Sequence, residues 1–242
     1  FRKRAKELCN KHKILMIYDE IYSGFGKCGY DFYFKKYGIV PDIITLSKSL
    51  GGGKSSISAY VTTKKVFAKS YGSLSGSLLH STTYNSLAEE CATVIETTNL
   101  LNDNKLIKNL SELNVLIKEK LERLRLKYPD IISEIRGSGC HYGIIFKKKF
   151  NFLKEILKLV PIKFIQDPLF LDKIIVTSVM EEYFSKKNVI TSFTSNRDVI
   201  LNISPSINSN KKDVNKKIED FEDIIKNGLE KLVLKFIKKN LI

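Results

Sequence analysis

The sequence predicts an α/β protein in which a smaller α+β domain follows a larger α/β domain. Short apolar runs alternate with helical segments in the first part of the chain, a pattern typical of a mostly parallel sheet. From about residue 87 onward, the apolar residues recur at helical spacing instead. With 43% hydrophobic residues, the 242-residue chain carries enough apolar side chains to bury a core.

The first domain is predicted to cover residues 1–104. Its strands are expected to be buried on both faces, because their apolar residues do not alternate with polar ones. Gly38 is expected to end a short helix, since glycine readily adopts the backbone conformation of a helix end. The predicted elements are helices over 1–12 and 31–37 and strands over 14–18, 42–46 and 57–62.

The second domain is predicted to cover residues 105–242. An Asn-Asp-Asn break at 102–104 separates it from a helix that begins at Leu87 and belongs to the first domain. A lysine-rich stretch between its two strands shows only a weak pattern. The predicted elements are a helix over 105–126, strands over 143–146 and 199–203, and one terminal amphipathic helix with its apolar face between Val214 and Phe236.

The net charge of +15, from 41 basic and 26 acidic residues, at first suggests a polyanion as partner. Clustering of the charges decides between that hypothesis and an ordinary lysine-rich surface. The lysines interleave with apolar positions along helices, as in Lys216-Lys217-Ile218, which is typical of a solvated helix face. We therefore expect no nucleic-acid partner. We also expect no membrane span, because every apolar run is shorter than the roughly 18 residues needed.

The four cysteines and three histidines are scattered along the chain. No pair of cysteines has the CxxC spacing, which favours reduced thiols in a cytoplasmic protein. No histidine has a partner at the spacing of metal ligands, so the sequence predicts no metal site.

Asp19 and Lys48 each follow a predicted strand. Ligands of open α/β sheets bind beyond the carboxyl ends of the strands, so both side chains are well placed for one. Lys48 stands beside three glycines, 51–53, whose backbone can approach a ligand closely. Burial of a lysine in an apolar sheet lowers its pKa, which suits Schiff-base chemistry. A helix cap or surface ion pair is the alternative for Asp19, and a P-loop is excluded because its first glycine is replaced by Lys48.

The hydroxyl-rich segment 80–85, which includes Thr83, precedes the helix that begins at Leu87. Hydroxyl and amide groups at a helix N-terminus bind phosphate, although an ordinary capping cluster fits this segment equally well. Together, the acid, the lysine and the hydroxyls are what pyridoxal phosphate requires. The acid keeps the pyridine nitrogen protonated, the amine forms the imine and the hydroxyls bind the phosphate.

Residues 19–29, 37–42 and 45–53 (DEIYSGFGKCG, YGIVPD and TLSKSLGGG) resemble the cofactor-lysine signature of the class III aminotransferases. These are pyridoxal-phosphate enzymes of fold type I that act largely on ω-amino groups. The spacing runs without a gap from Asp19 to Gly53. The resemblance is strong over 14–95 and weak over 147–195, and it implies the C-terminal part of the large domain followed by the small α+β domain.

The resemblance implies a role for five residues. Asp19 would hold the pyridine nitrogen, and Lys48 would form the Schiff base as the catalytic residue. Ile21 would pack against one face of the ring, and Tyr22 replaces a glutamine common near the phenolic oxygen. Thr83 would contact the phosphate from the neighbouring subunit of a homodimer.

Departures from the family pattern bear on substrate and completeness. Asn202 stands where many members carry an arginine, which in some of them binds a substrate carboxylate. The family's N-terminal portion has no counterpart before Phe1, so we expect a fragment of a longer polypeptide, an incomplete gene model or a degenerate copy. A chain without that portion is not expected to hold the cofactor well by itself.

The predicted function is therefore transfer of an amino group between an amine or amino acid and a keto acid or aldehyde, through a Schiff base at Lys48. The amino donor and acceptor stay open. One alternative is a pyridoxal-phosphate aminomutase or decarboxylase, because the cofactor would use the same lysine and acid for those reactions. Another alternative is a degenerate, non-catalytic fragment.

Overall fold

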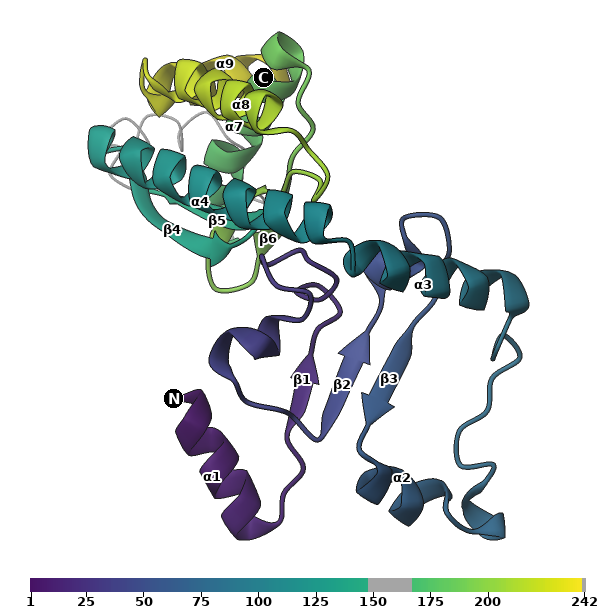
Figure 1. Ribbon diagram of the computed structural model, residues 1–242. Coiled ribbons are helices and arrows are strands. Elements are labelled where there is room, and N and C mark those ends of the chain that lie inside the picture. The colour runs from purple at the N-terminus through teal and green to yellow at the C-terminus, as the bar shows by residue number, and fades with distance from the viewer. Residues whose placement is uncertain (148–166, 241–242) are drawn as a thin grey trace. The chain divides into compact units, whose positions relative to one another are not determined.

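The computed structural model describes residues 1–147 and 167–240. The chain forms two compact units, Phe1–Ser111 and Glu112–Ile242, and each is described by itself. The predicted domain boundary after residue 104 falls at the start of the helix α4 (Asn104–Lys127), which continues from the first unit into the second. Both sheets and their helices are seen in Figure 1.

The first unit contains a three-stranded sheet, in the order β1 (Ile17–Asp19), β2 (Ile43–Leu46) and β3 (Ala59–Thr62). The predicted strands are confirmed in place, each shorter than expected. Strand β1 runs parallel to β2, and β3 runs antiparallel to it. The register places Asp19 opposite Thr45 and Thr45 opposite Tyr60, so these three side chains lie on the same face of the sheet.

The first unit also contains helices. Two of the predicted helices are confirmed as α1 and α3, while the segment predicted as a helix over 31–37 forms a 3₁₀ helix instead. Helix α2, which the sequence pattern did not predict, begins where the Thr63 hydroxyl accepts a hydrogen bond from the Val66 amide. The helices are α1 (Arg2–His12), η1 (Tyr33–Tyr37), η2 (Lys48–Gly51), α2 (Lys64–Tyr71), η3 (Leu74–Gly76) and α3 (Ala88–Leu101).

The apolar core of the first unit covers one face of its sheet. Ile44 and Leu46, which alternate with Thr45 along β2, pack in this core with Leu50 of η2 and Leu101 of α3. The other face borders an open hollow, and the Ile17 side chain is 57% exposed. The expectation of strands buried on both faces is therefore wrong for the described residues, because the core packs on only one face.

The second unit contains an antiparallel sheet in the order β4, β5, β7, β6. The sequence predicted β5 (His141–Phe146) and β7 (Val199–Ile203) but neither edge strand, β4 (Ile132–Ser138) or β6 (Ser192–Ser195). Charged and hydroxyl side chains interrupt both edge strands, as edge strands tolerate, and this obscures their apolar pattern.

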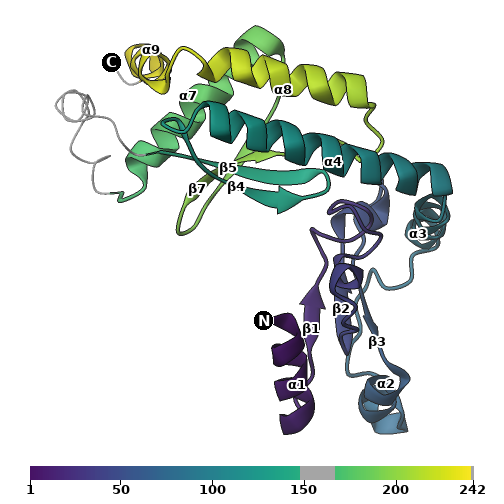
Figure 2. The same cartoon turned by 60° about the vertical axis from the view of Figure 1, so that its left-hand side comes forward.

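Helix α7 (Phe170–Lys187) and the C-terminal part of α4 pack against this second sheet, and the two helices that follow α7 in the chain pack against it. Helices α4 and α8 (Lys211–Ile225) lie side by side (Figure 2). Lys127 of α4 donates a hydrogen bond to Glu222 of α8 at 2.6 Å. Helix α7 contacts β5, β6 and β7. It lies in the stretch that showed only a weak pattern, because its apolar residues are not confined to one side of the helix. Residues 148–166 of that stretch lie outside the described residues.

The chain ends in two helices, α8 and α9 (Leu229–Asn240), and the prediction of one continuous helix is wrong. Gly228 has a left-handed backbone with φ of 85°, and its amide bonds to the Ile225 carbonyl at 2.9 Å. The break rotates the buried face, so that Val233 and Ile237 are buried where Leu232 and Phe236 were expected to be.

Candidate functional site

Asp19 ends β1 at the carboxyl edge of the parallel β1–β2 pair. Its Oδ1 accepts two hydrogen bonds, from the Ile21 amide at 2.9 Å and from the Thr45 hydroxyl at 3.2 Å. Within the described residues, its Oδ2 accepts none. The carboxylate is exposed to solvent. Asp19 is therefore an oriented carboxylate with one oxygen available to a ligand.

Glu20 has a different position, since its side chain is only 3% exposed. Its carboxylate accepts hydrogen bonds from the Ser23 hydroxyl at 2.5 Å and from the amides of Tyr33 and Phe34 at 3.1 and 2.7 Å. Those two amides belong to the first turn of η1, so Glu20 acts as its cap. This geometry agrees with a structural role for Glu20.

Lys48 begins η2, three residues after Thr45 on β2. Its backbone has φ of 49°, a left-handed conformation that costs a lysine about 1 kcal/mol. Strain of this kind persists where the surrounding structure imposes it, and it is common at functional sites. The Lys48 side chain is exposed, so the apolar surroundings expected from the sequence are not provided by the described residues.

The glycine run after Lys48 packs against helix α3. Gly52 and Gly53 have φ of 61° and 79°, as expected for glycines in a tight turn. A Cβ on Gly52 would lie 2.8 Å from the Thr97 hydroxyl oxygen of α3. Gly52 therefore allows a close approach to α3, which fixes the turn that carries Lys48, while the approach of this loop to a ligand stays a prediction.

In the structure, the Lys48 side chain lies against Tyr22, in the segment that follows Asp19. The Lys48 Nζ lies 5.5 Å from the centre of the Tyr22 ring, a cation–π contact. Ile21 is half-buried and lines the hollow on the open face of the sheet, together with Thr45 and Tyr60. This hollow has a volume of about 750 Å³. Four of the five predicted site residues thus lie at or beyond the carboxyl ends of β1 and β2.

Thr83 lies in an exposed loop, five residues before α3 begins at Ala88. No side chain caps α3, and its first turn contains Glu89 and Glu90. Glu89 pairs with Lys54 at 2.5 Å. Segment 80–85 therefore precedes α3 as expected, but the alternative that its side chains cap the helix is wrong, and acidic residues in the first turn disfavour an anion there. The role of Thr83 stays a prediction that the described contacts do not test.

Thr45 and the residues around Tyr60 belong to the site although the sequence did not single them out. The Tyr60 hydroxyl is 2.6 Å from that of Tyr71, and its ring meets that of His80 edge-on at 5.8 Å. The sequence does show Thr45 as a hydroxyl-bearing residue near the end of a predicted strand. Only the register between β1 and β2, which the sequence does not specify, shows that Thr45 lies opposite Asp19.

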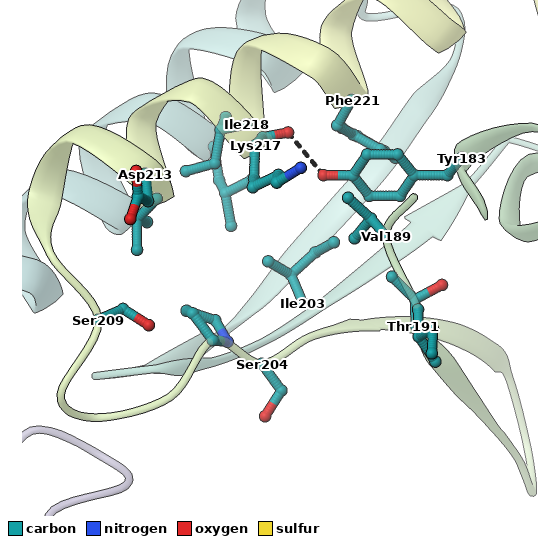
Figure 3. A pocket seen from close by; sticks show the side chains of 14 residues that line it. Tyr183, Val189, Thr191, Ile203, Ser204, Ser209, Asp213, Lys217, Ile218 and Phe221 are labelled. Carbon is teal, nitrogen blue, oxygen red and sulfur yellow. Dashed lines mark hydrogen bonds between the residues drawn. The ribbon is translucent and has the colours of Figure 1, made fainter. Parts of the chain in front are cut away.

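A second pocket, of about 180 Å³, lies within the second unit and is lined mainly by apolar side chains (Figure 3). On its wall the Tyr183 hydroxyl donates a hydrogen bond to the Lys217 carbonyl at 2.6 Å. Burial, and then the charge of Asp220, raise the pKa of Tyr183. None of the predicted site residues lines this pocket. Asn202 of β7 is buried, and its side-chain amide donates a hydrogen bond to the Ser192 hydroxyl at 3.2 Å. Because an asparagine is neutral, position 202 supplies no positive charge.

Two absences hold for the described part of the chain. Residues 1–147 and 167–240 contain no group of three or more His, Cys, Asp or Glu side chains arranged to bind a metal ion. In the same residues, every helix is too short or too polar to cross a membrane.

The fold and the site define an α/β domain with an acid and a lysine at the carboxyl edge of a parallel strand pair. The family model for aminotransferase class III matches residues 1–165. The chain therefore belongs to the class III aminotransferase family.

Named relatives agree with this family. An acetylornithine/succinyldiaminopimelate aminotransferase of Buchnera aphidicola is 33% identical over 71% of this chain and 40% of its own length. A putrescine aminotransferase of Pectobacterium atrosepticum is 35% identical over 64% of this chain and 33% of its own length. A transaminase of the marine bacterium Virgibacillus has the same fold, with a TM-score of 0.76 at 20% identity over 95% of this chain and 48% of its own. The chain thus spans less than half the length of these proteins.

Proposed function

We propose that this chain supplies the cofactor lysine and the ring-nitrogen acid of a pyridoxal-phosphate-dependent aminotransferase. The enzyme would transfer an amino group between an amine or amino acid and a keto acid or aldehyde. One observation carries the proposal. In a member of the class III family, Asp19 ends β1 and Lys48 follows β2, so that both lie at the carboxyl ends of neighbouring parallel strands.

The side chains present fit pyridoxal phosphate. Both anchors of Asp19 fall on Oδ1, which leaves Oδ2 for the protonated ring nitrogen. The Lys48 amine lies on a fixed turn beside Tyr22 and is exposed, so it is accessible to an aldehyde. Ile21, half-buried next to Asp19, offers an apolar side chain for one face of the ring. The Thr83 hydroxyl, from the second subunit of a homodimer, would bind the phosphate.

When bound, pyridoxal phosphate supplies an electrophilic carbon for amines and a conjugated ring that takes up electrons from a broken bond. The residues of this chain do the remaining work. Lys48 Nζ would hold the cofactor and, once displaced by a substrate amine, would take the proton from the substrate carbon and deliver it to the former aldehyde carbon of the cofactor. The Asp19 carboxylate would keep the ring nitrogen protonated through its charge. The Tyr22 hydroxyl would contribute a hydrogen bond near the phenolic oxygen.

The substrate proposal is an amine or amino acid as donor with a keto acid as acceptor. The two relatives are named for acetylornithine or succinyldiaminopimelate and for putrescine, which all carry an amino group on a carbon chain. A reducing compartment such as the cytoplasm belongs to the same proposal, since the four cysteines are described and none is joined in a disulfide.

The test is a titration of the full chain with pyridoxal phosphate up to a large excess, followed by visible absorbance. The excess is needed because the chain is not expected to hold the cofactor well by itself. We expect the band of the lysine-bound cofactor in the unsubstituted chain and its loss in Lys48→Ala. Lys54→Ala is the matched control, because Lys54 lies on the same loop but pairs with Glu89. Incubation with an amine donor and a keto acid then separates amino transfer from an aminomutase or decarboxylase. The proposal is wrong if the unsubstituted chain shows no band even at a large excess of pyridoxal phosphate, or if Lys48→Ala keeps the band.

A further inference from the structure

Thr45 contacts the end of β1 through both its backbone and its side chain. Its carbonyl oxygen accepts a hydrogen bond from the Glu20 amide at 3.0 Å, and its hydroxyl donates to Asp19 Oδ1 at 3.2 Å. The register explains this, because Asp19 is paired directly with Thr45 and the two side chains lie on the same face. Thr45 therefore holds both the backbone and the carboxylate at this point of the chain.

The second anchor of the carboxylate is local. The Ile21 amide donates to the same Oδ1 at 2.9 Å, which closes a turn between Asp19 and the residue two positions on. One anchor alone leaves a carboxylate free to rotate about its side-chain torsions. Two anchors on one oxygen, from different directions, fix the rotation and determine which oxygen stays available.

Among the described residues, Thr45 is the only side chain with a hydrogen bond to Asp19. Tyr60 lies on the far side of Thr45 in the same row of the sheet, but its hydroxyl is already paired with that of Tyr71 at 2.6 Å. The orientation of Asp19 by a neighbouring strand thus depends on one hydroxyl group.

We propose that Thr45 is a positioning residue of the cofactor site, whose hydroxyl holds the Asp19 carboxylate so that Oδ2 is presented to the ring nitrogen of pyridoxal phosphate. The inference rests on the proposed function for the identity of the ligand. The coupling between Thr45 and Asp19 does not depend on a ligand, and it can be measured without one.

The test compares Thr45→Val, which keeps the branched shape of the side chain and removes the hydroxyl, with Thr45→Ser, which keeps the hydroxyl. The matched control is Thr62→Val, because Thr62 lies in the same sheet but donates to the Asp42 carbonyl. Two quantities are measured in the full chain. They are the hydrogen-exchange rate of the Ile21 amide without cofactor, and the dissociation constant and visible circular dichroism of added pyridoxal phosphate.

In Thr45→Val we expect the Ile21 amide to exchange about fivefold faster and the dissociation constant of the cofactor to rise about fivefold, with altered dichroism. This is the size expected for the loss of one ordinary hydrogen bond, because the bond from Thr45 is exposed and 3.2 Å long. In Thr45→Ser and Thr62→Val, the exchange rate of the Ile21 amide and the dissociation constant of the cofactor should both stay within about twofold of the values for the unsubstituted chain. A rise in Thr45→Ser as large as that in Thr45→Val, or no change in either variant, would overturn the proposal. If the unsubstituted chain binds no cofactor, the proposed function fails, and the exchange rates alone decide whether Thr45 holds Asp19.

Discussion

Glu20 is the buried charge on which the local structure of the candidate site depends most directly. Its carboxylate is 3% exposed and accepts hydrogen bonds from one hydroxyl and two backbone amides. Replacement by alanine leaves the Tyr33 and Phe34 amides without this acceptor at the start of η1. Each buried donor left unpaired costs about 1–3 kcal/mol, so we expect Glu20→Ala to destabilise the first unit by about 3 kcal/mol.

A cost of about 3 kcal/mol corresponds to about a hundredfold change in the equilibrium for opening. Hydrogen exchange followed by mass spectrometry measures this change in peptides that cover Tyr33–Tyr37, while peptides from α8 in the second unit serve as an internal reference. Glu20→Gln, which keeps one acceptor oxygen, should give a smaller effect of about 1–2 kcal/mol.

Glu7→Gln is the matched control, because Glu7 is an exposed member of an ion pair on α1 in the same unit. It should leave exchange in Tyr33–Tyr37 unchanged, since exposed ion pairs contribute little. Equal exchange in Glu20→Ala and Glu7→Gln would refute the reasoning, because it would mean that the buried carboxylate does not hold η1.

Two other predictions concern the second unit. Burial by itself raises the pKa of Glu182, but hydrogen bonds from Lys186 and Lys235 lower this pKa below its ordinary value of 4.5. The ionised carboxylate therefore stabilises the fold above pH 4.5, and this stabilisation is lost as the pH falls through the lowered pKa. The unfolding free energy, measured by urea titration from about pH 6 to about pH 3, should therefore fall more steeply in the unsubstituted chain than in Glu182→Gln, and parallel curves would contradict this. Gly228→Ala should lower that free energy by about 1–2 kcal/mol, since a Cβ meets no atom within 4 Å and the cost comes from φ of 85° alone. Asn227→Ala is its control, and an equal loss in both variants would show that the left-handed backbone is not the cause.

The strands and the amphipathic helices could be predicted where their pattern is local. The apolar runs at β1, β2 and β3 stand out because each is short and bounded by turn residues. The regular stripe of α4 likewise appeared in the sequence, and Leu113, Ile117 and Leu121 are buried as expected.

Other elements could not be predicted, for physical reasons that can be named. Helix α7 packs against both a sheet and other helices, so its apolar residues cover more than one side and no stripe appears. The end of α8 was missed because the apolar pattern continues across Gly228, while its positive φ interrupts the helix. In both cases, packing or a single backbone angle outweighed the periodic signal.

By itself, the sequence determined that the chain is α/β, that Asp19 and Lys48 follow strands, and that they resemble the signature of one enzyme family. These properties depend on short stretches of sequence, so they can be predicted without knowing how distant parts of the chain pack together. Only the tertiary structure decided that Thr45 holds Asp19 and that Glu20 caps η1. Those hydrogen bonds join residues 13 to 26 positions apart, and they exist because strand register and chain reversal bring the partners within reach.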